Sequence, residues 1–232
     1  MAVSVEVVDD PARACAAIMV GTASGGGHVV LTGGSTPRAA YQEFVSAVHD
    51  VGVNVSDAVF WFGDERCVPP DDERSNYLMA KQSLLDPLGE GSVEVHRMRG
   101  ELGPFDGADE YEQELRDAGT PQFDLLLLGI GPDGHTASLF PDQDTLAVRE
   151  RLVVGVGEAG LEPFVPRISF TLSAIASARH VVFLATGSSK ASAVAAAFGS
   201  DAGPDPHVPS SMVPSVAEQL TVLLDSEAAA RL

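Results

Sequence analysis

Cysteine is scarce in this sequence, which contains only Cys15 and Cys67 among its 232 residues. Two cysteines are too few for a disulfide framework, and neither lies in a Cys-x-x-Cys metal-binding pattern. No apolar run approaches the roughly 20 residues that a membrane-spanning helix needs, and the first residues lack the basic segment of a signal peptide. These absences favour a cytoplasmic protein that has no membrane partner.

Basic residues are also few: 14 lysines and arginines stand against 33 aspartates and glutamates, which gives a formal net charge of −19. Nucleic acids and anionic membrane surfaces both require a basic footprint, so neither is an expected partner. A small anionic ligand is not excluded, because its site needs only a local positive potential. Only Lys81 and Lys190 are lysines, so the position of each is informative.

The most distinctive stretch covers residues 123–141, where the apolar run Leu125 to Leu128 ends in a glycine-rich turn. Because the run does not alternate, it is typical of a strand that is buried on both faces of a parallel sheet. Functional residues gather beyond the carboxyl ends of such strands, which is where Asp133 and His135 follow. A histidine there can exchange protons with a small molecule. The alternative is an ordinary tight turn with a surface histidine.

A second glycine turn follows the short strand that we predict over residues 28–31. Its residues Gly33, Gly34, Ser35 and Thr36 lead into a helix. The free N–H groups and the dipole at a helix start both favour an anion. The turn matches neither the Walker loop nor the dinucleotide-binding pattern, so it indicates a phosphate monoester site. The alternative is a purely structural turn before a helix that begins with proline.

Three further charged residues follow predicted strands. Asp64 and Arg66 form either a solvated loop or part of a site, in which arginine pairs with phosphate and aspartate accepts hydrogen bonds from sugar hydroxyls. Lys190 follows a strand and a glycine turn, so its ammonium can reach an anion bound at the strand ends. A solvated lysine is the alternative, although the helix dipole disfavours a cation at a helix start.

Strands and helices alternate along the sequence, which predicts a doubly wound, mostly parallel α/β sheet sandwiched by helices. We see no internal repeat or linker, so residues 1–232 are expected to form a single domain. Strands are predicted over residues 3–8, 28–31, 59–62, 93–96, 125–128, 152–156, 166–171, 180–185 and 220–224. Helices are predicted over residues 11–20, 38–49, 75–85, 108–118, 172–178, 191–198 and 226–232.

Five motifs together resemble the 6-phosphogluconolactonase family, in that family's order and over nearly the whole chain. They are LTGGSTP at 31–37, GDER at 63–66 with SNY at 75–77, GIGPDGHTASLFP at 129–141, PRIS at 166–169 and TGSSK at 186–190. The resemblance implies a Rossmann-like fold of the sugar-phosphate isomerase/deaminase type. It also implies hydrolysis of 6-phospho-D-glucono-1,5-lactone in the oxidative pentose phosphate pathway, with no cofactor or metal, and we expect a monomer.

Carried over by matching position, the resemblance implies that His135 is the catalytic base, with Asp133 beside it in the same turn. It implies that Arg66 and Lys190 bind the substrate phosphate and that Arg167 is a further site residue. The expected substrate-binding set is Gly33, Gly34, Ser35, Thr36, Asp64, Arg66, Asn76, Arg167 and Lys190.

These residues suggest a mechanism in which neutral His135 removes a proton from water, and the imidazolium then protonates the departing ring oxygen. Asp133 either orients the imidazole or favours its charged form. Backbone N–H groups around residues 131–134 are candidate donors to the tetrahedral oxyanion.

Two alternatives stay open. Glucosamine-6-phosphate deaminase shares the fold, the glycine loop and an Asp-Gly-His, but it carries a glutamate five residues after the histidine, where this sequence has Phe140. Without that carboxylate, this sequence lacks the proton relay that the deaminase reaction needs. A sugar-phosphate sensor is the non-enzymatic alternative, and it would bind the ligand without needing His135.

Overall fold

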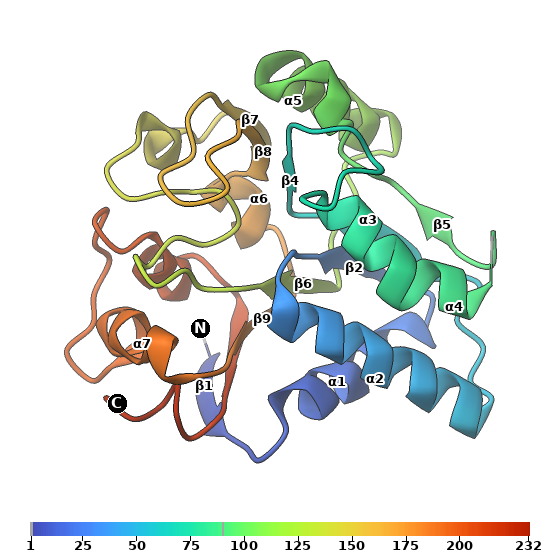
Figure 1. Ribbon diagram of the computed structural model, residues 1–232, viewed down its shortest axis with the longest axis horizontal. Coiled ribbons are helices and arrows are strands. Elements are labelled where there is room, and N and C mark those ends of the chain that lie inside the picture. The colour runs from blue at the N-terminus through green and yellow to red at the C-terminus, as the bar shows by residue number, and fades with distance from the viewer. Residues whose placement is uncertain (1, 90) are drawn as a thin grey trace.

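The computed structural model describes residues 2–89 and 91–232, and its centre is a parallel sheet of seven strands (Figure 1). In spatial order, the strands are β1 (Ala2–Val7), β10 (Gln219–Leu224), β9 (His180–Ala185), β6 (Leu125–Leu128), β2 (His28–Leu31), β3 (Val59–Phe62) and β5 (Glu94–Val95). All four leucines of β6 are buried, because β2 and β9 flank this strand and both of its faces are covered. The predicted parallel sheet is confirmed.

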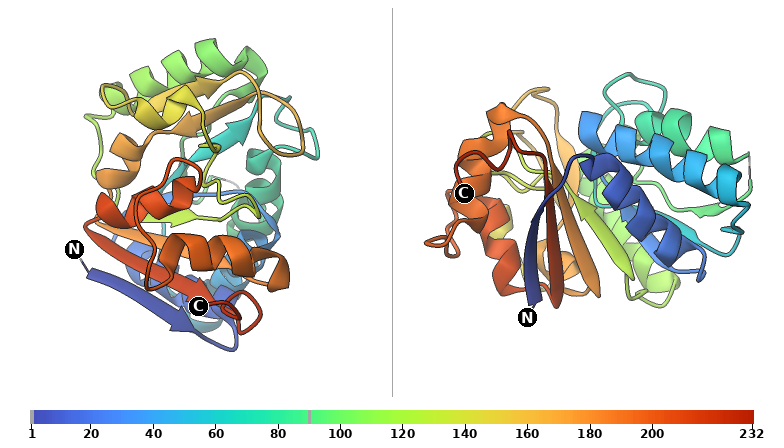
Figure 2. Two further views of the ribbon diagram at one scale, coloured as in Figure 1. Left: turned by 90° about the vertical axis from the view of Figure 1, so that its left-hand side faces the viewer. Right: turned by 90° about the horizontal axis from the view of Figure 1, so that it is seen from below.

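Helices cover both faces of this sheet. In Figure 2, α1 (Pro11–Ala23) and α2 (Ser35–Val51) lie on one face, and α7 (Ala191–Phe198) lies on the other. The α1 helix begins as predicted, with Pro11 in its first turn and the Asp10 carboxylate accepting a hydrogen bond from the N–H of Arg13 at 3.0 Å. The α2 helix begins three residues earlier than predicted, because the first turn has no intrahelical N–H bonds and therefore tolerates Pro37.

The order of the strands creates a switch point between β2 and β6. From β2 the chain moves outward through β3 to β5 at one edge, and it then returns to the other side of β2 as β6 before moving out to β9 and β10. Loops that leave the carboxyl ends of two such neighbouring strands diverge, and the crevice between them is where ligands bind in open α/β sheets.

A second sheet departs from the prediction. Its three strands, β4 (Asp64–Arg66), β8 (Arg167–Phe170) and β7 (Val153–Val156), are antiparallel, and helix α5 (Pro104–Asp117) packs against β7 and β8. Only Gly63 separates β4 from β3, so the chain passes directly from one sheet to the other. The sequence predicted β7 and β8 as strands, but short strands show no sign of which sheet they join.

Two helix ends also differ from the prediction. The helix predicted over residues 75–85 continues to residue 88, as α3 (Asn76–Ala80), a π-helical turn (Lys81–Leu85) and α4 (Asp86–Leu88). Pro87 is tolerated in the first turn of α4. The predicted terminal helix is wrong, since residues 226–231 form turns. Asp225 organises them by accepting hydrogen bonds from the N–H groups of Ala228 and Gly187.

The remaining helix, α6 (Leu172–Ala176), follows β8 directly, with the Thr171 hydroxyl accepting a hydrogen bond from the N–H of Ala174. Among the described residues, no helix combines the length and apolar character needed to cross a membrane.

Candidate active site

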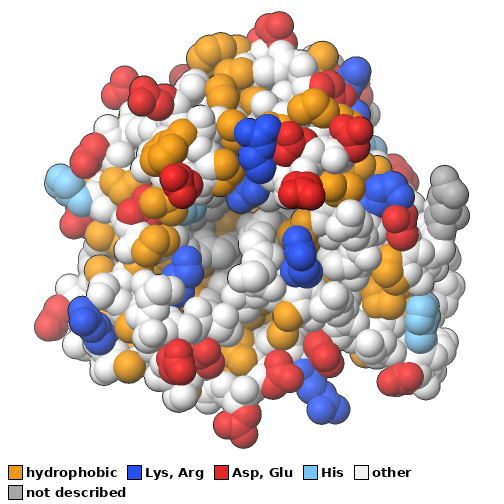
Figure 3. All heavy atoms as spheres, in the orientation of Figure 1, with side chains coloured by type: hydrophobic (Ala, Val, Ile, Leu, Met, Phe, Trp, Pro, Cys, Tyr) orange, Lys and Arg blue, Asp and Glu red, His pale blue; other side chains and the backbone are white. Residues whose placement is uncertain are grey.

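A cavity of about 220 Å³ opens at the switch point, beyond the carboxyl ends of β2, β6 and β9 and beside the second sheet. Figure 3 shows a hollow near the centre of this face with lysine and arginine side chains around it. Nine of the predicted site residues line the cavity: Gly33, Gly34, Ser35, Thr36, Asp64, Arg66, His135, Arg167 and Lys190. Asp133 and Asn76 do not line it, but each contacts a residue that does, Asp133 through His135 and Asn76 through Asp64.

His135 is paired with Asp133 in the turn after β6. Its Nδ1 lies 2.6 Å from Asp133 Oδ1, and its backbone N–H donates to the same oxygen at 3.2 Å. A carboxylate accepts a hydrogen bond, so Nδ1 carries the proton and Nε2 carries the lone pair in the neutral ring. Burial alone would raise the pKa of Asp133, but the hydrogen bonds and charge of His135 outweigh burial and lower it. In this tautomer Nε2 is the imidazole nitrogen that can accept a proton.

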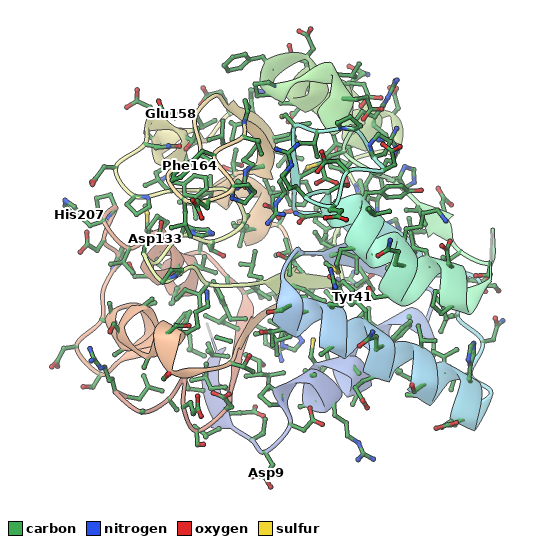
Figure 4. The ribbon with its side chains drawn as sticks, in the orientation of Figure 1. Asp9, Tyr41, Asp133, Glu158, Phe164 and His207 are labelled. Atoms are coloured by element: carbon green, nitrogen blue, oxygen red, sulfur yellow. The ribbon has the colours of Figure 1, made fainter. Side chains whose placement is uncertain are left out.

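Close packing shapes this turn. A Cβ at Gly131 would overlap His135 Nδ1 and Asp133 Oδ1, so only glycine fits there. Figure 4 shows Asp133 on the loop that follows β6. The N–H of Gly131 donates to the carbonyl of His135 at 2.9 Å, and the N–H of Gly134 donates to the carbonyl of Gly131 at 3.0 Å. These two N–H groups are thus already engaged within the turn, and a role for the backbone N–H groups of residues 131–134 in holding the oxyanion stays a prediction.

The glycine turn after β2 holds the start of α2 against the cavity. Gly34, at φ 120°, precedes the helix, and no side chain caps its first turn. The backbone N–H groups at this end are therefore left for an anion. The hydroxyl of Tyr41, labelled in Figure 4, donates to the carbonyl of Thr32 at 2.8 Å and accepts from its N–H at 2.9 Å, which anchors the turn to the helix.

Arg66 and Arg167 face each other as a cross-strand pair of β4 and β8. Arg167 is buried, and burial followed by the charge of Arg66 lowers its pKa to about 10. Its guanidinium donates to the carbonyls of Val165 at 3.1 Å and Pro163 at 2.8 Å. The buried Nε of Arg66 has no hydrogen-bond partner. Like charges directly opposite one another are destabilising, and an anion that binds between them offsets that repulsion.

Asp64 is buried at the edge of the cavity, and protein groups already engage both of its carboxylate oxygens. Oδ1 accepts from the Asn76 amide at 3.1 Å, and Oδ2 accepts from the Ser138 hydroxyl at 2.8 Å. Asn76 is itself buried against Gly33, where a Cβ would overlap its amide. Asn76 therefore positions Asp64 and the glycine turn, and the sequence motif gave no sign of this indirect placement.

Lys190 lines the cavity from the turn between β9 and α7. Burial lowers the pKa of its ammonium, and the charge of Asp133 opposes that shift. Thr36 and Thr186 share a hydrogen bond of 2.8 Å between their hydroxyls, which ties this turn to the start of α2. The only other lysine, Lys81, forms a surface ion pair with Asp86.

Glu65 is a supporting residue that sequence reasoning missed. It is buried between Asp64 and Arg66, and its carboxylate accepts hydrogen bonds from the N–H groups of Asn76 at 2.7 Å and Tyr77 at 2.8 Å. Burial raises its pKa, while the backbone donors oppose that shift. A carboxylate that accepts hydrogen bonds at a helix start usually belongs to the residue just before the helix. Glu65 belongs to β4 instead, so the sequence next to α3 does not reveal this cap.

The lining residues outside the predicted set include Phe140, Leu161 and Glu162. The last two belong to the loop between β7 and β8, which the sequence gave no reason to place near His135. Arg38 and Arg74 do not line the cavity, and Arg74 forms a surface ion pair with Asp72. Within residues 2–89 and 91–232, no group of three or more His, Cys, Asp or Glu side chains is placed to hold a metal ion.

Comparison with known proteins gives a consistent family. The family model for glucosamine-6-phosphate isomerases/6-phosphogluconolactonase matches residues 4–222. The chain is 39% identical to a 6-phosphogluconolactonase of Streptomyces coelicolor over 221 residues, which is 90% of this chain and 83% of the relative. It is 38% identical to the human 6-phosphogluconolactonase over 207 residues, which is 87% of this chain and 79% of the relative.

Solved structures agree with this. A crystal structure of 6-phosphogluconolactonase from Leishmania guyanensis matches with a TM-score of 0.83 and 29% identity, covering 98% of both chains. A monomeric glucosamine-6-phosphate deaminase matches with a TM-score of 0.84 but only 19% identity over the full length of both chains, so this likeness concerns the fold alone. The predicted sugar-phosphate isomerase/deaminase-like fold is confirmed.

Proposed function

The chain belongs to the glucosamine-6-phosphate isomerase/6-phosphogluconolactonase family, and we propose that it hydrolyses 6-phospho-D-glucono-1,5-lactone to 6-phosphogluconate in the pentose phosphate pathway. The observation that carries this proposal is a shared cavity: the imidazole of His135 and the cations Arg66, Arg167 and Lys190 all line it. A proton acceptor and an anion site must open into one cleft if an enzyme is to hydrolyse a phosphorylated lactone.

In the proposed reaction, Nε2 of His135 takes a proton from water as the water oxygen attacks the lactone carbonyl carbon. The carbonyl electrons move to its oxygen, which gives a tetrahedral oxyanion. When that oxyanion collapses, the bond to the ring oxygen breaks and the imidazolium returns its proton to the departing oxygen. Asp133 holds the Nδ1–H tautomer and stabilises the imidazolium that forms between the two steps.

Phosphate binding supplies affinity and positioning in this proposal. The start of α2, Arg66, Arg167 and Lys190 form a positive wall around the cavity in a protein with a net charge of −19. Such remote binding energy orients the lactone carbonyl against the attacking water, so the unphosphorylated lactone should react poorly. Because the N–H groups of Gly131 and Gly134 are engaged, we assign oxyanion stabilisation to the positive side chains of the cavity.

The two alternatives have less support. The position that holds the deaminase glutamate is Phe140, whose ring is buried, so no carboxylate stands there to relay a proton. A sensor would not need an Asp133–His135 pair on the wall of its ligand cavity. We therefore favour the hydrolase over both.

The test is acid release, followed with a pH indicator, when purified protein meets freshly prepared phosphogluconolactone. The hydrolase accelerates ring opening above the uncatalysed rate. His135→Ala should lower kcat on the order of 10²–10⁴-fold, the usual contribution of a general base. A deaminase would instead release ammonia from glucosamine 6-phosphate, and a sensor would bind the lactone without accelerating its opening. Either of those results would contradict the proposal.

We further propose that the whole chain acts as one catalytic unit. The family match, which extends over residues 4–222, supports this. A monomeric state and a cytoplasmic location stay predictions, and sedimentation and cell fractionation would test them.

A further inference from the structure

Phe140 belongs to a small apolar cluster that is separate from the main core. It is 1% exposed and packs with Val156 and Ala159, with Leu161 against them. The cluster lies between the His135 turn and the loop that joins β7 to β8. Figure 4 shows Phe164 of that loop on the same side of the molecule as Asp133. A buried phenylalanine outside the main core contributes little to the packing of that core. Its contacts with residues of the cavity therefore indicate its role.

The ring of Phe140 contacts two functional side chains at once. Its centroid lies 4.8 Å from that of the His135 imidazole, with the planes tilted by 42°. The guanidinium carbon of Arg167 lies 6.0 Å from the same centroid, which is within the range of a cation–π contact. Phe140 also lines the cavity. One aromatic ring therefore lies between the proposed base and a proposed phosphate ligand.

Hydrogen bonds fix only part of each of these two side chains, His135 and Arg167. The bond from Nδ1 to Asp133 holds one atom of the imidazole and leaves rotation of the ring plane to packing. The Arg167 guanidinium is held from the side of the Pro163 and Val165 carbonyls. The Phe140 ring supplies a surface against which both planar groups are oriented. The cavity needs this orientation, because a misplacement of about 1 Å can cost on the order of 100-fold in rate.

We propose that Phe140 is a positioning residue, whose ring holds the imidazole of His135 at a fixed distance and angle from the guanidinium of Arg167. This inference rests on the proposed lactonase activity. It adds that phosphate binding at Arg167 and proton transfer at His135 are coupled through one ring. Removing the ring uncouples the two groups, so the substrate phosphate no longer places the carbonyl correctly against the attacking water.

The coupling is measured with Phe140→Leu, Arg167→Lys and the double variant. Phe140→Leu should lower kcat about 10-fold or more while KM rises less, since orientation is lost more than binding. Arg167→Lys lowers kcat/KM by one factor in the wild-type background and by another in the Phe140→Leu background. The second factor should be at least about 3-fold smaller, because the effects of residues that act together are not additive. The preference for the phosphorylated over the unphosphorylated lactone should fall in Phe140→Leu for the same reason.

Phe123→Leu is the matched control. Phe123 is equally buried, but it precedes β6 at the opposite end of the strand and packs against Phe170 and Trp61. It should lose comparable thermal stability and keep its kinetics. A second perturbation leaves the Phe140 ring in place: a Cβ at Gly160 would lie 3.1 to 3.3 Å from Phe140, so Gly160→Ala displaces the ring without removing it. It should lower kcat severalfold, and Gly21→Ala, with open space around it, should not.

The inference is wrong if folded Phe140→Leu keeps kcat within about twofold of the wild type, or if its effect and that of Arg167→Lys simply multiply. If Phe140→Leu does not fold, an unchanged kcat in Gly160→Ala refutes the inference instead. The wild-type rate alone tests the lactonase proposal, whereas the ratios between variants test only the role of Phe140. The two failures are therefore distinguishable.

Discussion

Replacing Asp133 by asparagine removes one charge and keeps the shape of the side chain. The asparagine oxygen can still accept the hydrogen bonds that Asp133 Oδ1 now receives from Nδ1 and from the backbone N–H of His135. The Nδ1–H tautomer and the orientation of the ring are therefore retained. What disappears is the attraction between the carboxylate and the imidazolium that forms as the water is deprotonated.

The size of this loss follows from the geometry. Two unit charges about 4 Å apart attract by about 4 kcal/mol at an effective dielectric constant of about 20. If about half of the positive charge has developed in the transition state, the loss is about 2 kcal/mol, or about 30-fold in rate. The side chains of His135 and Asp133 are 20% and 27% exposed, so water screens part of this attraction. We therefore expect kcat to fall about 10- to 30-fold.

The assay is initial-rate acid release across a range of lactone concentrations. KM should stay within about twofold of the wild-type value, because Asp133 does not line the cavity. Asp205→Asn is the control: Asp205 holds His207 in the same way, with Oδ1 2.7 Å from Nδ1 and 2.9 Å from the backbone nitrogen, but both side chains are exposed and neither lines the cavity. A kcat for Asp133→Asn within about threefold of the wild type would refute the electrostatic role.

Three further predictions use other parts of the structure. Gly131→Ala should keep the fold in circular dichroism but lose most activity, because the added methyl group overlaps the imidazole of His135, the proposed base. Lys190→Ala should raise KM about 10-fold or more with little change in kcat, whereas Lys81→Ala should change neither, and an unchanged KM in Lys190→Ala would exclude a phosphate role. The hydrogen-bonded ion pair with Arg97 lowers the pKa of Glu101 to about 2, below its value in the unfolded chain. The ion pair therefore stabilises the fold above about pH 5, and this contribution is lost as the pH falls toward 2. Glu101→Gln should therefore lower the free energy of unfolding by up to about 1 kcal/mol at pH 7 and by nothing near pH 2, measured by urea denaturation.

The sequence by itself determined the main sheet and the two turns that contain glycine. Leu125 to Leu128 have no alternation, so burial on both faces was the only way to keep four consecutive leucines out of water. The spacing of Asp133 and His135 within one turn also placed their side chains in reach of each other, because a single turn spans only a few ångströms. Both features depend only on residues that are adjacent in the chain, so the sequence alone is enough to predict them.

Only the tertiary structure decided how the far parts of the site meet. Arg66 and Arg167 lie about a hundred residues apart in the chain, and they face each other because β4 and β8 pair in a second sheet that no periodicity revealed. Asn76 and Glu65 became supports, because helix α3 happens to start beside β4. The sequence named the histidine and the three cations of the cavity, but the directions and partners of these side chains follow from strand register and from packing across the whole fold. Both are set by non-local contacts.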